Sequence, residues 1–224
     1  MANKKIRPSS KLVEEYLYKK YEIDKDSPSP IEIPNVGRSS LPEILKELNF
    51  KVGAEIGVEK GLHMKQLIKR NPNLKMFAVD PYVKYDGYNS WTPEIFAGNY
   101  QIAHERLDVY PNVEFIRKYS MDALADFEDE SLDFVYIDAN HAYKFVMEDI
   151  IGWEKKVRPG GILAGHDYVH ARYGRDKKTM MNVKKAVNQY TRENNINPWF
   201  ILGTDGKVPG QIRDNSRTWL WVKK

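Results

Sequence analysis

The sequence predicts a three-layer α/β fold, in which helices cover both faces of a mostly parallel β-sheet. Short apolar runs alternate with segments of helical periodicity from residue 52 onward, an order typical of strand–helix units. A turn with Gly57 and Gly61 follows the first run, where a strand would lead into a helix. The chain ends in two apolar runs separated by a glycine-rich loop, which predicts a terminal hairpin.

The residues before the first strand predict an accessory segment. Residues 10–21 carry four apolar side chains at helical spacing, and residues 24–34 are rich in Pro, Ser and Asp, as expected of a linker or surface loop. A short helix is expected at 42–48, where a proline stands at the start. We therefore divide the chain into an N-terminal helical extension and linker, 1–40, and one domain, 41–224.

Seven strands and the helices between them follow from the alternation. The expected strands are short and apolar, like the buried strands of parallel sheets, and lie at 52–56, 76–79, 113–116, 134–137, 162–164, 199–202 and 218–222. The expected helices show 3.6-residue periodicity and lie at 61–70, 93–110, 121–127, 143–156 and 180–193. Pro159, Gly160 and Gly161 predict a turn into the fifth strand.

Composition restricts the chemistry. The chain has 224 residues, 42% of them hydrophobic, which suffices for one substantial core. Without cysteine, any metal must be held by carboxylates, imidazoles or water. The sequence has no apolar run long enough to span a membrane and no signal-peptide pattern, so we expect a cytoplasmic protein. The net charge of +4 is scattered, which gives little support to nucleic-acid binding.

The turn after the first strand favours a nucleotide cofactor. Gly57 and Gly61 would let the backbone approach a ligand at a helix N-terminus. Glu59 stands where the dinucleotide fingerprint has its second glycine, so a pyrophosphate would face a carboxylate. S-adenosylmethionine carries an ammonium and a sulfonium and no phosphate, and therefore tolerates both Glu55 and Glu59. The alternative is an ordinary strand-to-helix turn.

Two later strand ends add candidate contacts to this cofactor. Asp80 follows the second strand about twenty residues after the glycine turn, where an acidic side chain meets ribose hydroxyls. Its alternative role is to cap a turn. Ser120 is placed to hydrogen-bond the adenine edge, and Met121 to pack on the adenine face.

These segments together resemble class I S-adenosylmethionine-dependent methyltransferases. The resemblance rests on 55–61, Asp80, 133–141, 158–161 and 165–168, and covers roughly 41–224. It is closest to the small-molecule and sugar O-methyltransferase branch that includes the macrocin O-methyltransferase-like proteins. It implies a Rossmann-like sheet of seven strands with an antiparallel last strand. It also implies that Glu55, Gly57 and Gly61 surround the methionine part of the cofactor, that Asp80 binds ribose, and that Ser120 and Met121 lie by adenine. We add Asp138, at the end of the fourth strand, to the cofactor-binding candidates.

Neighbouring strand ends also suggest where the methyl acceptor binds. Asp138, His166 and Asp167 would converge there as ligands of a divalent metal. The resemblance implies magnesium, but His166 favours a softer metal such as manganese or zinc, or a site without metal. His141, three residues after Asp138, is our candidate general base, with Asp138 beside it; its alternative is a helix N-terminal residue.

The predicted function is transfer of a methyl group from S-adenosylmethionine to a hydroxyl of a small molecule or sugar. Loops 84–91 and 169–178 are candidate lids, and the N-terminal helix is a candidate lid or a contact in a homo-oligomer. A nucleic-acid methyltransferase and a non-catalytic cofactor-binding protein remain alternatives. Glu59 argues against a nicotinamide-dependent oxidoreductase.

Overall fold

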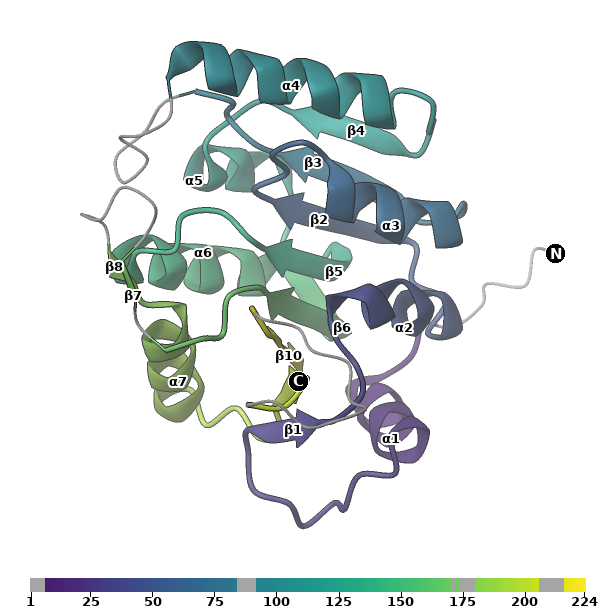
Figure 1. Cartoon of the computed structure of the whole chain (residues 1–224). Coiled ribbons are helices and arrows are strands. Elements are labelled where there is room, and N and C mark those ends of the chain that lie inside the picture. Colours follow the sequence, from purple (N-terminus) through teal and green to yellow (C-terminus); the bar gives the residue numbers. More distant parts are fainter. Residues whose placement is uncertain (1–6, 84–91, 171, 174–179, 206–215) are drawn as a thin grey trace, which may run out of the picture.

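The computed structural model describes residues 7–83, 92–170, 172–173, 180–205 and 216–224. In this part of the chain, eight strands form one sheet in the order β1-β9-β10-β6-β5-β2-β3-β4. Helices cover both faces of the sheet (Figure 1). The predicted Rossmann-like α/β fold is therefore confirmed.

The elements have the following bounds. The sheet contains β1 (Ile31–Ile33), β2 (Val52–Ile56), β3 (Lys75–Val79), β4 (Val113–Ile116), β5 (Leu132–Ile137), β6 (Val157–Gly165), β9 (Phe200–Leu202) and β10 (Thr218–Val222). A separate ladder pairs β7 (Arg172–Tyr173) with β8 (Met180–Met181). The helices are α1 (Ser10–Lys20), α2 (Leu41–Glu47), α3 (Leu62–Arg70), α4 (Pro93–Leu107), α5 (Ser120–Ala123), α6 (Tyr143–Lys156) and α7 (Val183–Glu193), with 3-10 turns η1 (Arg38–Ser40) and η2 (Leu124–Asp126).

Strand β5 shows why the sheet has helices on both sides. Every residue of β5 is buried, as expected for a central parallel strand. Phe134 and Tyr136 belong to the core that packs against α1, α2 and α3. Val135 and Ile137 belong to the second core, under α5, α6 and α7. The continuous apolar run of this strand thus supplies two cores at once.

The N-terminal segment is part of the sheet, which corrects the prediction of a linker over 24–34. Strand β1 pairs in parallel with β9 and raises the number of strands from seven to eight. Ile31 and Ile33 are buried and Glu32 is exposed, a strand pattern too short to stand out between flanking prolines. Helix α1 packs over β6 and β10 and buries Val13 and Leu17 completely. A domain boundary at residue 40 remains a prediction.

Several predicted boundaries differ from the structure. The helix expected at 121–127 is divided into α5 and η2, and the helix expected at 180–193 begins only at Val183, after β8. The turn expected at 159–161 lies inside β6, because a register shift in the β5–β6 pairing accommodates the extra residues. The terminal hairpin is confirmed, since β10 pairs antiparallel with both β9 and β6.

The order of the strands determines where a ligand can bind. From β2 the chain adds β3 and β4 on one side, and then returns to add β5 and β6 on the other (Figure 1). In such sheets ligands bind at the carboxyl ends of the strands beside this switch point. Three non-glycine residues there have left-handed backbones: Glu59 (φ 49°) after β2, Tyr82 (φ 50°) after β3 and Asp167 (φ 55°) after β6. Strained residues of this kind cluster at functional sites.

Candidate functional site

The loop between β2 and α3 requires both of its glycines. Gly57 has φ 86°, and a Cβ there would lie 2.3 Å from the Asp138 carbonyl oxygen. Gly61, the N-cap of α3, has φ 69°, and its Cβ would lie 2.6 Å from Leu107 Cδ1. Any side chain at Gly57 would therefore push the loop away from the end of β5. The predicted cofactor loop and the end of β5 are in direct backbone contact.

Asp80 joins the loops that follow β2 and β3. Its Oδ2 accepts hydrogen bonds from the backbone N–H groups of Val58 and Glu59, both at 3.0 Å. Its Oδ1 accepts from the Tyr82 N–H at 2.9 Å. Burial raises the pKa of Asp80, although these three hydrogen bonds favour the charged form. The turn-capping role is present in the structure, and ribose binding by Asp80 stays a prediction.

Glu55 pairs with His63, a residue that the sequence analysis did not select. His63 Nδ1 lies 2.8 Å from Glu55 Oε1, and both side chains are buried. The His63 ring lies 4.3 Å, between centroids, from the ring of Tyr136. Among the described residues, Glu55 Oε2 and His63 Nε2 have no hydrogen-bond partner. The pair holds the start of α3 against β2 directly behind the glycine loop.

The two predicted adenine contacts differ: Ser120 is held by hydrogen bonds within the protein, whereas the side chain of Met121 is exposed. The Ser120 hydroxyl donates to Asp149 and accepts from Trp153 Nε1 at 2.8 Å, so it ties α5 to α6. Burial raises the pKa of Asp149 to about 7. Met121 is 38% exposed and remains available at the surface.

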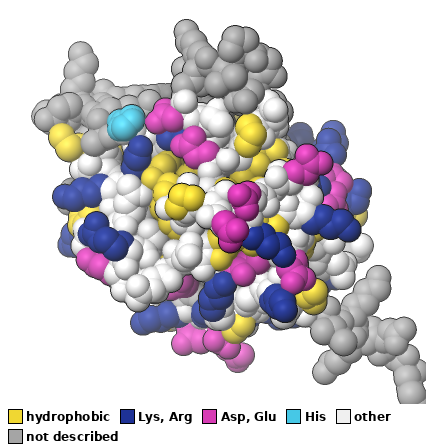
Figure 2. All heavy atoms as spheres, turned by 90° about the horizontal axis from the view of Figure 1, so that it is seen from below, with side chains coloured by type: hydrophobic (Ala, Val, Ile, Leu, Met, Phe, Trp, Pro, Cys, Tyr) yellow, Lys and Arg dark blue, Asp and Glu magenta, His cyan; other side chains and the backbone are white. Residues whose placement is uncertain are grey.

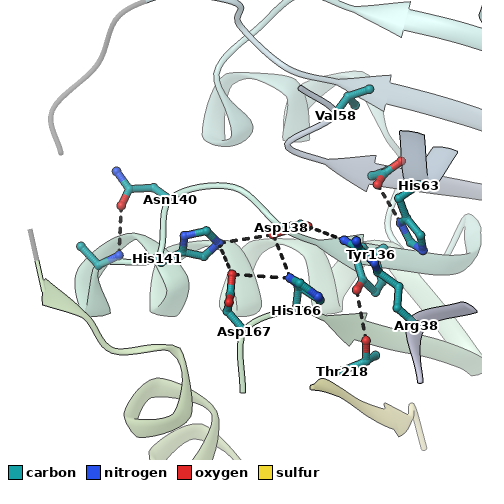
Figure 3. A network of polar contacts seen from close by, with 12 residues as sticks. Arg38, Val58, His63, Tyr136, Asp138, Asn140, His141, His166, Asp167 and Thr218 are labelled. Carbon is teal, nitrogen blue, oxygen red and sulfur yellow. Dashed lines mark hydrogen bonds and ion pairs between the residues drawn. The ribbon is translucent and has the colours of Figure 1, made fainter. Parts of the chain in front are cut away.

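Asp138, His141, His166 and Asp167 converge at the carboxyl ends of β5 and β6 (Figure 3). His141 Nε2 lies 3.3 Å from Asp138 Oδ1 and 3.0 Å from Asp167 Oδ2. His166 Nδ1 lies 3.7 Å and 3.5 Å from the same two oxygens. Asn140 accepts a hydrogen bond from the Ala142 N–H at 3.0 Å, which shapes the turn that carries His141. The sequence analysis expected these strand ends to converge, and the structure brings all four side chains together.

The carboxylates and imidazoles of this cluster stabilise each other's charges. Burial lowers the pKa of His141, but hydrogen bonds and attraction to Asp138 and Asp167 outweigh it and raise that pKa to about 10. Burial opposes the charge of the two carboxylates, yet the pKa of each is lowered by the neighbouring histidines. At neutral pH, His141 is therefore an imidazolium between two carboxylates, and it needs a change in charge nearby before it can accept a proton.

The cluster has the donor set of a metal site. Asp138, His141 and Asp167 each offer one ligand atom, and these atoms lie within 4.8 Å of one another. Mixed carboxylate and imidazole ligands suit manganese, iron or zinc better than calcium. The residues present thus fit a divalent cation. The histidine in this group is His141, whereas the sequence analysis selected His166.

Arg38 is a further member of the cluster that the sequence analysis did not select. It lies in η1, and its Nη1 donates to Asp138 Oδ2 at 3.2 Å (Figure 3). The two residues are 100 positions apart in the sequence, so no local pattern reveals the contact. The predicted lid 84–91 lies outside the described residues, as do residues 171 and 174–178 of the lid predicted at 169–178.

A comparison with family models defines the class of the protein. A family described as a methyltransferase domain matches residues 54–168, more than half of the chain. The chain therefore belongs to this family of methyltransferase domains. The match runs from β2 to the residues just after β6, and includes the glycine loop, Asp80 and the Asp138–Asp167 cluster. A search of curated proteins found no match.

Solved structures with the same fold are distant in sequence. A proposed caffeoyl-CoA O-methyltransferase from Staphylococcus aureus has 13% identity and a TM-score of 0.59, with 96% of this chain and 92% of that chain covered. TomG, an O-methyltransferase from Streptomyces achromogenes, has 16% identity and a TM-score of 0.55, with coverage of 95% and 89%. The CurJ carbon methyltransferase has 12% identity and a TM-score of 0.57, with coverage of 83% and 54%. At these identities the likeness shows the fold alone.

Proposed function

We propose that this protein transfers the methyl group of S-adenosylmethionine to a hydroxyl group of a small molecule or sugar. The observation that carries the proposal is the contact of Gly57 with the Asp138 carbonyl, where a Cβ would lie only 2.3 Å away. The loop after β2 therefore lies beside Asp138, and this proximity supports the proposal that the cofactor binds next to the cluster. A methyl donor and an acceptor bound at these two neighbouring places would meet at the ends of β2 and β5, at the switch point of the sheet.

The cofactor contacts in this proposal follow from the strand ends. Glu55, Gly57 and Gly61 would surround the methionine part, and Asp80 would bind ribose. TomG, a structural neighbour, was solved in complex with S-adenosylmethionine. Glu59 keeps a carboxylate at the loop, which suits a cationic ligand and disfavours a pyrophosphate. Ser120 and Met121 would border adenine, Met121 through its exposed side chain, and Asp138 would adjoin the reacting end of the cofactor.

Asp138, His141 and Asp167 would hold a divalent cation, manganese or magnesium, with His166 beside them. A cation held there would supply positive charge that lowers the pKa of a nearby acceptor hydroxyl, and His141 would have to lose its proton to bind the cation. The two carboxylates would help to orient the acceptor at the ends of β5 and β6. Without a metal, the same cluster is a histidine held between two carboxylates.

Where no cation occupies the cluster, His141 is the proposed base, provided that its imidazole is neutral. The acceptor oxygen attacks the methyl carbon as the bond from that carbon to sulfur breaks, and the hydroxyl proton moves to His141. S-adenosylhomocysteine and the methyl ether are the products. Much of the rate would come from alignment of oxygen, carbon and sulfur, because positioning of two bound reactants contributes several kcal/mol. The macrocin O-methyltransferase-like branch is the proposed place within the family.

The charges on one face of the molecule give no support to nucleic-acid binding at that face. On the face seen in Figure 2, basic and acidic side chains alternate and form no continuous basic patch. Proteins that bind nucleic acids present a continuous basic patch to the phosphates.

Among the described residues, the search for helices that could span a membrane found none.

Calorimetric titration tests the proposal. S-adenosylmethionine and S-adenosylhomocysteine are each titrated into the protein, with and without Mn²⁺ or Mg²⁺. We expect micromolar binding of both nucleosides, and a separate heat of cation binding. A protein that binds neither nucleoside is no methyltransferase of this kind. Binding of both without methyl transfer to any hydroxyl compound would favour a non-catalytic cofactor-binding protein.

A further inference from the structure

Arg38 approaches Asp138 from a part of the chain that precedes the methyltransferase family match. The family match begins at residue 54, whereas Arg38 lies in η1, between β1 and α2. Its guanidinium donates to Asp138 Oδ2, while His141 and His166 approach the other oxygen, Oδ1. The two oxygens of one carboxylate are thus divided between Arg38 and the cluster.

The charge of Arg38 matters for any cation at this site. Arginine stays protonated at every physiological pH, so Asp138 always faces a positive charge on its Oδ2 side. A divalent cation bound at Oδ1 would share the carboxylate with that charge. The side chains of Arg38 and Asp138 are 36% and 20% exposed, so solvent screens the repulsion only in part.

We infer that Arg38 is a positioning residue and the built-in counter-cation of Asp138. It holds Oδ2, leaves Oδ1 directed at His141 and His166, and weakens the affinity of the cluster for a divalent cation. The inference rests on the metal site in the proposed function. Without Arg38 the Asp138 side chain could rotate more freely. Cation binding would then have to restrict that rotation, which costs conformational entropy and disfavours binding slightly. Loss of Arg38 would also remove the repulsion between a single and a double positive charge, and this Coulomb effect is the larger of the two.

The test is Mn²⁺ binding to the full chain at low ionic strength, measured by calorimetry and by the electron paramagnetic resonance signal of free Mn²⁺. Arg38→Gln and Arg38→Ala should bind Mn²⁺ about tenfold more tightly than the wild type, since they remove a charge beside the ligand. Arg38→Lys keeps the charge and should stay within about threefold of the wild type. Arg70→Gln is the matched control, because it removes the same charge from an exposed pair with Glu43.

Each outcome decides the inference. The inference is overturned if both neutral variants, Arg38→Gln and Arg38→Ala, bind Mn²⁺ with unchanged or weaker affinity. It is also overturned if Arg38→Lys or Arg70→Gln gains as much Mn²⁺ affinity as the neutral variants do. Binding by the neutral variants but not by the wild type supports it. If no variant binds Mn²⁺, the inference is wrong. Titration of the same samples with S-adenosylhomocysteine then shows separately whether the proposed methyltransferase function survives.

Discussion

Asp80 caps the loop after β2, and we propose that it also binds the ribose of the cofactor. Its carboxylate accepts three backbone hydrogen bonds, yet a carboxylate has about four acceptor positions, so capacity remains for a ribose hydroxyl. Asp80→Ala should weaken S-adenosylhomocysteine binding at least about tenfold, because both the ribose partner and the order of the loop are lost. Calorimetry measures the affinity. Asp126→Ala is the control and should bind normally, because Asp126 is an exposed residue at the end of η2 that pairs with Lys118. Unchanged affinity in Asp80→Ala would remove Asp80 from the cofactor site.

The raised pKa of Asp149 predicts how the stability of the fold depends on pH. Its pKa is raised to about 7 by burial, against about 4 in an unfolded chain. The protonated form is the one the fold favours, so this group contributes its stability fully below pH 4. This stabilising contribution decreases as the pH rises from about 4 to about 7. Above about pH 7 the free energy of unfolding no longer changes through this group. Since each pKa unit corresponds to about 1.4 kcal/mol, the loss is about 4 kcal/mol at most.

Asp149→Asn should therefore be more stable than the wild type at pH 8, by roughly 2–4 kcal/mol, and similar to it at pH 4. An asparagine keeps an oxygen that accepts from Ser120 and carries no charge. Urea unfolding at several pH values between 4 and 8 measures the difference. Asp122→Asn, on the exposed side of α5, is the control and should follow the wild type. A difference that does not grow with pH would contradict the assignment.

Helix α1 packs on β6 and β10, and one leucine tests whether it is an integral element of the fold. Leu17 is completely buried under the sheet, whereas Leu12 on the same helix is 57% exposed. Leu17→Ala should lower the free energy of unfolding by about 2–5 kcal/mol, because it leaves a cavity. Leu12→Ala should change it by less than about 0.5 kcal/mol. Denaturant unfolding of both variants makes the comparison. Similar small effects would mean that α1 is a detachable extension, as a boundary at residue 40 predicts.

The central elements could be predicted from the sequence, and the N-terminal ones only in part. Strands β2 and β5 are buried on both faces, so their apolar runs stand out without knowledge of the fold. Strand β1 has only three residues and gains its stability from pairing with β9, about 170 residues later, which no local pattern records. The periodicity of a single sequence indicates which residues are buried, but it does not indicate which distant strand a segment pairs with.

The candidate site shows the same division between local and distant information. The convergence of Asp138 and Asp167 could be expected, since both follow parallel strands and such strand ends meet at one edge. The Glu55–His63 pair and the Arg38–Asp138 contact join residues whose separation depends on the packing of α3 and η1. The sequence therefore could not show that Arg38 faces Asp138, and only the structure shows which charges in the cluster lie next to each other.

At the scale of the whole molecule, the proposed cofactor would join the two halves of the sheet. In the proposal its contacts would come from loops after β2 and β3 on one side of the switch point, and from the end of β5 on the other. A ligand that binds only the folded protein stabilises it by about 2.7 kcal/mol at a concentration one hundred times its Kd. For a chain of this size that corresponds to a rise in Tm of about 5–10 °C. We expect this rise with S-adenosylhomocysteine, measured by calorimetric or fluorescence melting. NAD should leave the Tm unchanged, because its pyrophosphate would face Glu59. A rise with NAD and none with S-adenosylhomocysteine would mean that the loop after β2 accepts a phosphate, and the oxidoreductase alternative would replace the methyltransferase.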